Sequence, residues 1–272
     1  MRAVVLARGL ARRMRHADDH AALAPAQAAA AAAGRKAMMP VGEAGEPART
    51  FLDYVLSSLA DAGCRDVALV IGPEHADVRA RYTRDARPVR FDLAFVTQPV
   101  ARGTADAVLA CERWAAADPF LVVNADNLYP VDVLRALGRL DGPGLPVFRP
   151  DDLATGGIPP DRIGTFALVR IGRHGLLESI VEKPGAEAIR DMGDEARVSM
   201  NCWRFDDRIF EACRDVPLSS RGELELPQAV GVALARGVPF RAVPAAGPVL
   251  DLSRRSDVAE VSRRLAGREV RL

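Results

Sequence analysis

Short apolar runs alternate along the chain with longer stretches in which apolar residues recur at helical spacing. The runs are continuous, which indicates strands buried on both faces, as in a parallel sheet between helices. In the first half we expect strands at 3–7, 67–71, 93–96 and 120–123, and helices at 51–62 and 104–116. This strand–helix alternation predicts an α/β fold with a doubly wound sheet.

The second half has a more mixed pattern. There we expect strands at 165–169, 179–181, 199–205 and 240–243, and helices at 226–235 and 258–265. The one low-complexity segment is the alanine-rich stretch 21–33. Because alanine is the best helix former, this stretch predicts a short helix, either an exposed insertion or a lid.

Length, net charge and cysteine content limit the class of protein and the kinds of partner that we expect. The chain has 272 residues, of which 49% are hydrophobic, enough for one large domain with a substantial core. A net charge of +1 gives no electrostatic case for nucleic acid. No apolar run approaches the roughly 18 residues of a membrane-spanning helix. The four cysteines show no CxxC pair, which argues against a zinc site and favours the reducing cytosol.

The first expected strand leads into a turn of small and basic residues, LARGLARRM at 6–14. Glycine permits close backbone approach to a phosphate, and arginine supplies fork-shaped charged donors. Lys36, which precedes an apolar run ending in proline, reaches the same phosphates if the connection folds back. The pattern predicts a phosphate-binding loop, and a solvated basic turn is the plain alternative.

Two further features have simpler interpretations. His16 and His20 have the i, i+4 spacing that can bind a metal on a helix, but no other ligands lie nearby in the sequence. We therefore favour a solvated helix face. Trp114 and Trp203 are interpreted as packing residues, with Trp203 a candidate for the border of a sugar pocket because it lies near Asn201.

The order of the motifs resembles the sugar-nucleotidyltransferase family, which includes glucose-1-phosphate thymidylyl- and uridylyltransferases. Against that family's L-A-x-G-x-G-T-R signature and its later P-K-x-x-x-P-V, Gly9 matches the first glycine, Arg13 the catalytic arginine and Lys36 the lysine. The other matches follow in order over most of the chain: QP at 98–99, GTADA at 103–107, NADN at 124–127, EKP at 182–184, RGELEL at 221–226 and VLDL at 249–252.

The resemblance implies one domain over 1–272, with a nucleotide-binding half at about 1–130 and a sugar-phosphate-binding half at 131–272. Its expected fold is a Rossmann-like doubly wound mixed sheet in three α/β/α layers. The implied cytoplasmic enzyme takes a nucleoside triphosphate and a sugar 1-phosphate, uses Mg²⁺, and releases a nucleotide-sugar and pyrophosphate. Gln98 and the RGELEL stretch favour dTTP or UTP. The oligomeric state is left open, with a homo-oligomer as one alternative. Neither nucleic acid nor membrane is expected as a partner.

Phosphoryl transfer between two anions makes charge neutralisation and alignment the protein's main tasks. The resemblance assigns catalysis to Arg13 and Lys36 on the triphosphate, and to Lys183, which pairs with the sugar phosphate for in-line attack. It assigns the metal to Asp126 and Asp251, whose carboxylates are hard oxygen ligands. Asp126 also follows an apolar strand, at the edge where α/β sheets bind ligands, and a helix cap is its plain alternative.

The remaining expected contacts divide between the two substrates. The nucleotide-binding residues are Leu6, Ala7, Gly9, Gln98, Gly103 and Thr104. Among them, Gln98 is expected to read a pyrimidine through its amide donor and acceptor. The sugar-binding residues are Gly164, Glu182, Asn201 and Glu223. A Glu-Lys pair before a turn proline is common on protein surfaces, so an exposed turn is the alternative for Glu182.

Several residues depart from the family pattern. Ala11 and Arg12 replace a glycine and a threonine or serine, and because alanine disfavours positive φ we expect a differently shaped phosphate loop. Arg8 adds a bulky charge near the base, and Leu252 departs from the last motif. Two alternatives follow. One is a nucleotidyltransferase for a non-sugar phosphate or phosphonate, of the CTP type. The other is a catalytically silent nucleotide-sugar-binding regulatory subunit.

Overall fold

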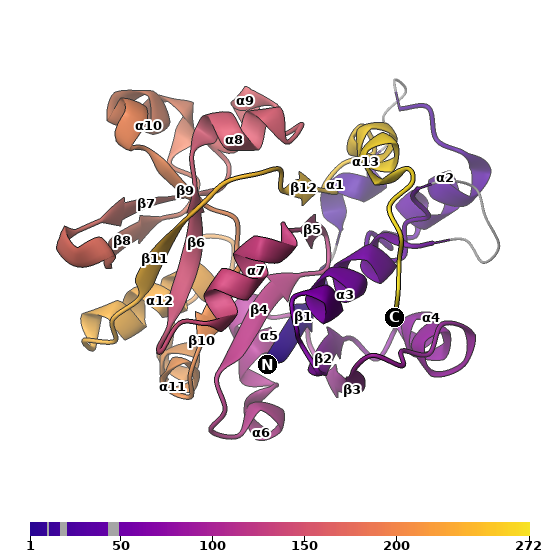
Figure 1. Ribbon diagram of the computed structural model, residues 1–272, viewed down its shortest axis with the longest axis horizontal. Coiled ribbons are helices and arrows are strands. Elements are labelled where there is room, and N and C mark those ends of the chain that lie inside the picture. The colour runs from indigo at the N-terminus through magenta and orange to yellow at the C-terminus, as the bar shows by residue number, and fades with distance from the viewer. Residues whose placement is uncertain (10, 17–20, 43–48) are drawn as a thin grey trace.

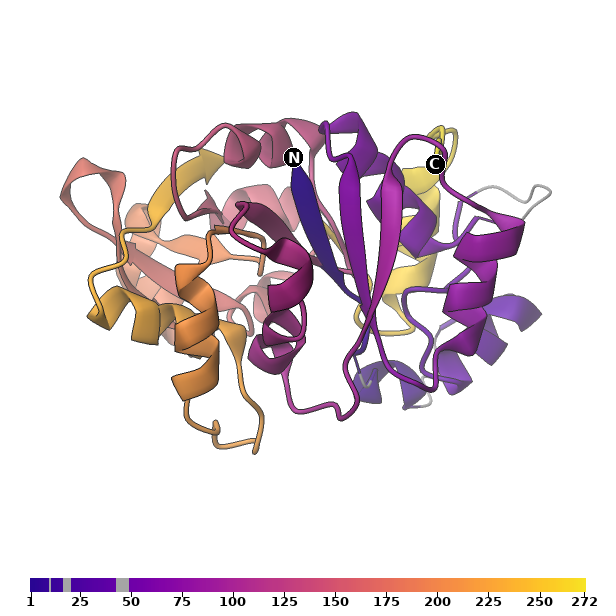
Figure 2. The same ribbon diagram turned by 90° about the horizontal axis from the view of Figure 1, so that it is seen from below.

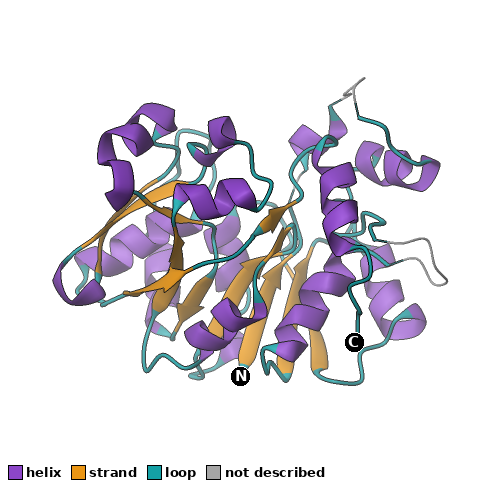
Figure 3. Ribbon diagram, turned by 45° about the horizontal axis from the view of Figure 1, so that its top comes forward, coloured by secondary structure: helices purple, strands orange, loops and turns teal. Residues whose placement is uncertain are grey.

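A mixed sheet of ten strands forms the middle layer of the protein, with helices on both faces (Figures 1 and 3). The computed structural model describes residues 1–9, 11–16, 21–42 and 49–272. The expected three-layer α/β/α arrangement is confirmed. His20, the second residue of the expected histidine pair, lies outside the described residues.

The bounds of the elements follow in chain order. The strands are β1 Arg2–Leu6, β2 Asp66–Ile71, β3 Asp92–Thr97, β4 Phe120–Asn124, β5 Asn127–Leu128, β6 Gly144–Phe148, β7 Ala167–Ile171, β8 Leu177–Val181, β9 Arg197–Ser199, β10 Trp203–Phe205, β11 Arg241–Ala245 and β12 Leu250–Asp251. The α-helices are α1 Arg12–Arg15, α2 Pro25–Ala32, α3 Phe51–Asp61, α4 Ala76–Ala80, α5 Thr104–Leu109, α6 Glu112–Ala115, α7 Val131–Gly138, α8 Pro150–Thr155, α9 Pro160–Ile163, α10 Gly185–Met192, α11 Arg208–Asp215, α12 Leu226–Ala235 and α13 Asp257–Leu265. A π-helix, η1 Arg81–Asp85, and two 3₁₀ turns, η2 Arg173–Gly175 and η3 Gly193–Glu195, complete the set.

Successive residues of the central strand β1 belong to different hydrophobic cores. Ala3 and Val5 share one core with α3, α7 and α13. Val4 and Leu6 share the other with α5, α11 and α12. Since side chains alternate across a strand, a strand covered by helices on both sides needs apolar residues at every position. This explains why the N-terminal strand reads as a continuous apolar run.

The parallel strands place their carboxyl ends at one edge of the sheet. Their order is β3-β2-β1-β4, with β1 paired in parallel to both β2 and β4 (Figure 2). Strand order therefore reverses at β1, and α/β proteins bind ligands in the crevice at such a point. Beyond β4 the sheet continues through β10, β6, β9, β7 and β8 with antiparallel pairing, while β11 pairs in parallel with β6.

The single strand expected at 199–205 is wrong, because the chain forms β9 and β10 on either side of a bend. Asn201 lies in the bend with φ +59°, a left-handed conformation that asparagine tolerates better than most residues. β9 pairs with β6 and β7, whereas β10 pairs with β4 and β6. The bend thus divides a segment that stays beside β6 into one strand that pairs with β7 and another that pairs with β4.

Strand β6 was not expected from the sequence because it contains both glycine and proline. Pro146 has no N–H to donate and normally disfavours a central strand. Here it lies between two antiparallel pairings, Gly144 with Arg204 and Phe148 with Val198, where the neighbouring chain is interrupted. The bend between β9 and β10 therefore removes the partner that a mid-strand donor would otherwise need.

The helix expected at 104–116 is divided into α5 and α6, and α6 ends at Ala116 in a conformation that alanine disfavours. Ala116 is exposed and has φ +51° and ψ −127°. We expect Ala116→Gly to raise the free energy of unfolding by about 1 kcal/mol, because glycine adopts positive φ without a Cβ clash. Urea denaturation measures the change. The control Ala29→Gly, at an exposed position within α2, should instead lower it by about 1 kcal/mol. Equal changes in both variants would contradict the argument.

The alanine-rich stretch forms the expected short helix, α2, which contacts α1 beside the first expected phosphate loop. Helix α12 has the bounds that the sequence predicted. No helix in the described ranges combines the length and the apolarity needed to cross a membrane.

Candidate active site

A cavity of about 450 Å³ opens at the carboxyl edge of the parallel strands and is lined by both halves of the chain. With the exception of Gly164, every residue to which the resemblance assigned a role in the site lines it. They are Leu6, Ala7, Gly9, Arg13, Lys36, Gln98, Gly103, Thr104, Asp126, Glu182, Lys183, Asn201, Glu223 and Asp251. Residues more than 200 positions apart in the sequence therefore meet around one space.

Gly164 is not among the lining residues and packs behind them. A Cβ on Gly164 would lie 2.7 Å from the backbone nitrogen of Ala186, and the Gly164 carbonyl accepts a hydrogen bond from the Gly185 nitrogen at 3.2 Å. This close approach supports the turn that carries Lys183. Thr165 and Phe166, the next two residues, line the cavity instead.

The two expected metal ligands are brought together by a short ribbon outside the main sheet. β12 pairs with β5 so that Asp251 lies opposite Asn127, the residue after Asp126. The Leu252 nitrogen donates to the Asp126 carbonyl at 2.9 Å. Leu252 itself is fully buried in the core, so its departure from the family pattern leaves Asp251 in the site.

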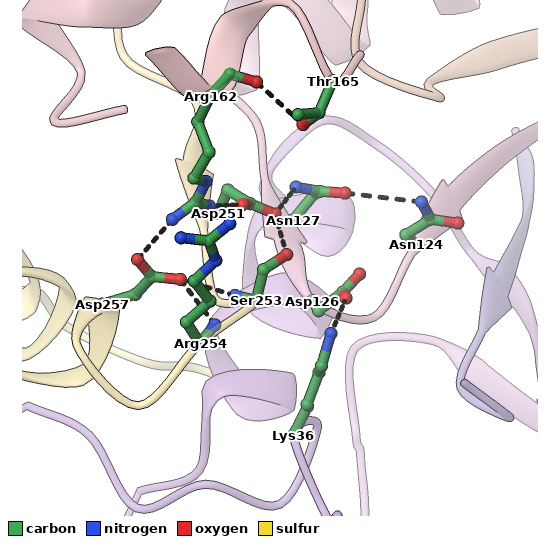
Figure 4. Close-up of polar contacts among 10 residues, drawn as sticks. All are labelled: Lys36, Asn124, Asp126, Asn127, Arg162, Thr165, Asp251, Ser253, Arg254 and Asp257. Atoms are coloured by element: carbon green, nitrogen blue, oxygen red, sulfur yellow. Dashed lines mark hydrogen bonds and ion pairs between the residues drawn. The ribbon is translucent and has the colours of Figure 1, made fainter. Parts of the chain in front are cut away.

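Asp251 is buried and its carboxylate is held from several sides (Figure 4). Oδ1 accepts hydrogen bonds from Asn127 Nδ2 at 2.9 Å and from Ser253 Oγ at 3.0 Å. Oδ2 accepts from a guanidinium nitrogen of Arg162. Burial, followed by the nearby Asp126 carboxylate, raises the pKa of Asp251 to about 6, and Arg162 opposes the shift.

Asp126 lies closer to solvent than Asp251, with 28% of its side chain exposed against 4%. Lys36 Nζ donates to its Oδ2 at 3.1 Å, and Oδ1 has no hydrogen-bond partner within the described ranges. Figure 4 shows the Lys36 side chain reaching Asp126 from below. The described residues hold no cluster of three or more metal-ligating side chains. Two carboxylates facing one cavity suit Mg²⁺, which keeps water and phosphate in its other positions.

The turn after β1 keeps a glycine-like backbone despite its substitution. Ala11 is buried and has φ +48°, a left-handed conformation that glycine adopts without a steric penalty. Alanine therefore adopts the positive φ that it disfavours, at a cost of about 1 kcal/mol, and the differently shaped loop stays a prediction. A Cβ on Gly9 would meet no atom of the described residues within 4 Å, which leaves the Gly9 backbone open for a ligand.

Gln98 is tied to the start of α5. Its Nε2 donates to the Gly103 carbonyl at 3.0 Å and to Asp106 Oδ2 at 2.7 Å. An amide nitrogen has two hydrogens, so its donor capacity is used inside the protein. The expectation that Gln98 presents both a donor and an acceptor to a base is therefore wrong, and Oε1 alone is left for a ligand.

The GTADA and RGELEL segments are hydrogen-bonded to each other. Gly103 has φ +126°, and a Cβ there would lie 2.3 Å from the Leu224 carbonyl oxygen, so only glycine fits. Thr104 Oγ1 accepts a hydrogen bond from the Leu226 nitrogen at 2.9 Å. Thr104 thus joins two walls of the cavity through its hydroxyl.

Arg8 folds against the wall of the cavity rather than filling it. Its Nε donates to Glu74 Oε1 at 3.1 Å, and a terminal nitrogen donates to the Gln98 carbonyl. Ten per cent of its side chain is exposed. Burial acts to raise the pKa of Glu74, but hydrogen bonding and charge from Arg8 outweigh it and lower that pKa.

On the sugar side, two residues hold strained backbones next to the cavity. Lys183 has φ +48° and Asn201 has φ +59°. Such conformations persist where the surrounding structure enforces them, often at functional sites. Burial and the Glu225 carboxylate raise the pKa of Glu182, the residue before Lys183. Arg221 lines the same wall and forms an ion pair with Glu225 at 2.7 Å.

Three observations complete the comparison with the sequence, and the first is that Trp203 is a packing residue as expected but does not form the pocket border for which it was a candidate. Trp203 is fully buried and stacks on Phe205 at a centroid distance of 5.7 Å, so it packs in the core and does not border the cavity. Arg162 contacts Asp251 but carries no motif that marks it. The third observation was visible in the sequence: only two of the 37 basic residues are lysines, and both Lys36 and Lys183 face the cavity.

Comparisons with known proteins identify the family and the fold. A family model described as "Nucleotidyl transferase" matches residues 32–264. The chain is 25% identical over 227 residues to a glucose-1-phosphate thymidylyltransferase of Streptomyces antibioticus, covering 78% of this chain and 56% of that protein. It is 22% identical over 231 residues to the UTP–glucose-1-phosphate uridylyltransferase AglF of Haloferax volcanii, covering 83% and 88%.

A third relative, the bifunctional protein GlmU of Azorhizobium caulinodans, is 31% identical over 227 residues, covering 81% of this chain and 48% of that protein. The chain spans 41%, 56% and 65% of the lengths of three curated relatives that it matches. A solved UDP-glucose pyrophosphorylase complexed with UDP-glucose has the same fold, with a TM-score of 0.71 over 97% of both chains at 16% identity.

Proposed function

The chain belongs to the nucleotidyl transferase family, and on that premise we propose that it joins a nucleoside monophosphate from a triphosphate to a sugar 1-phosphate, with release of pyrophosphate. One observation carries the proposal: two lysines, Arg13 and two carboxylates from distant segments line a single cavity at the switch point of the sheet. That set supplies the charge neutralisation on which phosphoryl transfer depends. We also propose that residues 1–272 act as one domain, which the continuous sheet supports.

In this proposal the turn after β1 and the two cationic residues Arg13 and Lys36 hold the triphosphate. Backbone N–H groups near Gly9 approach its oxygens, and the cations stabilise the charge that grows on the leaving pyrophosphate. Lys183 pairs with the phosphate of the sugar substrate and aligns it for attack on the α-phosphorus. Glu182 and Asn201 line the same cavity as Lys183 and form hydrogen bonds with the sugar hydroxyls in this proposal.

Asp126 and Asp251 are the residues that would hold Mg²⁺, and the ion would neutralise phosphate charge and orient the reacting groups. Lys36 Nζ lies 3.1 Å from Asp126 Oδ2. When the triphosphate binds, Lys36 is expected to shift its charge toward the phosphates and free that oxygen. Asp126 has the more accessible carboxylate and is the main protein ligand in this proposal.

For the base we favour thymine or uracil. Oε1 of Gln98 accepts no hydrogen bond from the described residues, so that oxygen can accept the N3–H that both bases carry. The thymidylyl- and uridylyltransferase names of the relatives support the same choice. The cytoplasm is the compartment we propose, in keeping with four buried free cysteines.

A pyrophosphate-release screen tests the proposal. Purified protein with Mg²⁺ is incubated with each common nucleoside triphosphate, including dTTP, UTP and CTP, against a panel of sugar 1-phosphates, alcohol phosphates and phosphonates. The proposal predicts release with dTTP or UTP and a sugar 1-phosphate. Release restricted to CTP with a non-sugar phosphate or phosphonate would favour the first alternative. Tight binding of a nucleotide-sugar without release from any pair would favour the silent regulatory subunit.

A further inference from the structure

A buried ion-pair cluster lies behind the cavity, and its cation is Arg162 of α9. Five per cent of the Arg162 side chain is exposed. One terminal guanidinium nitrogen donates to Asp251 Oδ2 and the other to Asp257 Oδ1, the latter at 2.5 Å. Figure 4 shows the guanidinium between these two carboxylates. A buried arginine needs such pairing, since an uncompensated charge in the interior is costly.

Asp257 is held independently of Arg162. Its Oδ2 accepts hydrogen bonds from the backbone nitrogens of Ser253 at 2.8 Å and Arg254 at 2.7 Å. The segment between β12 and α13 is thereby closed around the carboxylate. Asp257 therefore offers Arg162 a fixed second partner and competes with Asp251 for its charge.

The two carboxylates assigned to the metal differ in how many acceptor positions remain for a metal ion. A carboxylate accepts about four hydrogen bonds or ligands in total. Asn127, Ser253 and Arg162 take three of these positions on Asp251. On Asp126, Lys36 is the one hydrogen-bond donor within the described ranges. Asp251 is therefore the poorer ligand, and the guanidinium contacts the oxygen that retains capacity.

We infer that Arg162 is a positioning residue and a fixed internal cation of the metal site. It orients Asp251, and its charge limits how tightly the site binds a divalent ion. This inference rests on the proposed function. Because the cluster is buried, solvent and salt screen its charges weakly, so one charge nearby changes the binding of a divalent ion substantially. Asp257 acts in the opposite direction, since its carboxylate offsets the arginine.

The inference gives two variants with opposite expected effects. Arg162→Met removes the cation, and we expect the protein to bind Mn²⁺ about tenfold more tightly. Asp257→Asn keeps an oxygen for the backbone donors but removes the offsetting charge, and we expect about tenfold weaker binding. The control is Arg254→Met, which removes an exposed arginine of the same segment and leaves its backbone nitrogen on Asp257. The control should change the affinity less than about twofold, because solvent screens an exposed charge.

Full-length protein is titrated with Mn²⁺ alone near pH 8, and free Mn²⁺ is measured by electron paramagnetic resonance. A purely structural role for Arg162 predicts weaker binding in both buried variants, or no change, and either result overturns the inference. If Arg162→Met does not fold, Arg162→Gln takes its place, since it also removes the cation, and an affinity at or below that of the wild type overturns the inference. Pyrophosphate release by the wild type is measured in parallel. If the wild type releases pyrophosphate and the variants bind Mn²⁺ with unaltered affinity, only this inference is wrong. If the wild type neither releases pyrophosphate nor binds Mn²⁺, the proposed function is wrong as well.

Discussion

Asp126→Asn should reduce pyrophosphate release by about 10³-fold, a loss of about 4 kcal/mol of transition-state stabilisation. The substitution keeps the size of the side chain and removes the more accessible of the two carboxylates proposed to hold the metal. Without it, the protein has no open anionic oxygen at the end of β4 to hold a divalent ion against the triphosphate. The rate is measured by pyrophosphate release under saturating substrates over a range of Mg²⁺ concentrations.

The matched control is Asp132→Asn on α7, whose side chain is 91% exposed and pairs with Arg135 on the same helix. It should retain the wild-type rate, because an exposed ion pair contributes little. Asp126→Asn should unfold in urea within about 1 kcal/mol of the wild type, because its side chain is partly exposed and has one ionic partner. If Asp126→Asn folds normally and keeps more than a tenth of the wild-type rate of pyrophosphate release, Asp126 is not a ligand of the proposed metal site.

The parallel half of the sheet is predictable from sequence because its elements obey local rules. Continuous apolar runs mark strands covered on both faces, and β1 and β2 follow this pattern. The second half departs from these rules at particular residues. Pro146 lies inside a central strand, and Asn201 divides an apolar run in two through a left-handed bend. Each residue is accommodated by the neighbouring segment, and no local pattern reveals that neighbour.

In the candidate site too, local motifs predicted which residues line the cavity, but not the contacts that these residues make with distant segments. Motif order identified the cavity-lining residues because the motifs lie at strand ends, turns and helix starts that line the same cavity. Hydrogen bonding changed what Gln98 offers to a ligand, since its amide donors are taken by Gly103 and Asp106. Arg162 was missed because its partners lie about ninety positions away on β12 and α13. An ordinary arginine in an arginine-rich chain gives no sign of such burial.

Composition held one signal that motif matching does not use. With lysine at two of 37 basic positions, arginine serves almost every surface role in this chain. The two side chains are not equivalent, since lysine is a compact point charge and arginine a planar fork. Where a chain that otherwise uses arginine has lysine instead, we infer that the site favours the compact ammonium group of lysine over the larger guanidinium group. Both exceptions line the cavity, which is independent support for their proposed contacts with phosphate.

This scarcity of lysine permits a direct test on Lys183. We expect Lys183→Met to lower kcat/KM for the sugar phosphate by about 100-fold, mainly through KM, because it removes a charge-assisted hydrogen bond to the substrate phosphate. KM for the nucleoside triphosphate should change little, since Lys36 and Arg13 are proposed to hold that substrate. The control Arg170→Met removes an exposed charge from β7, next to β8, and should leave both constants unchanged.

Reductive methylation with carbon-13 formaldehyde labels both lysines and the N-terminal amine, and the Lys183→Met and Lys36→Met variants assign the two side-chain signals. Adding a sugar 1-phosphate should shift the Lys183 signal and leave the Lys36 signal in place, because the two lysines line opposite parts of the cavity in the proposal. Adding the triphosphate should shift the Lys36 signal, as its ammonium group exchanges Asp126 for phosphate. If both substrates moved the same lysine signal and the other stayed fixed, the division of the cavity into a triphosphate side and a sugar-phosphate side would be wrong.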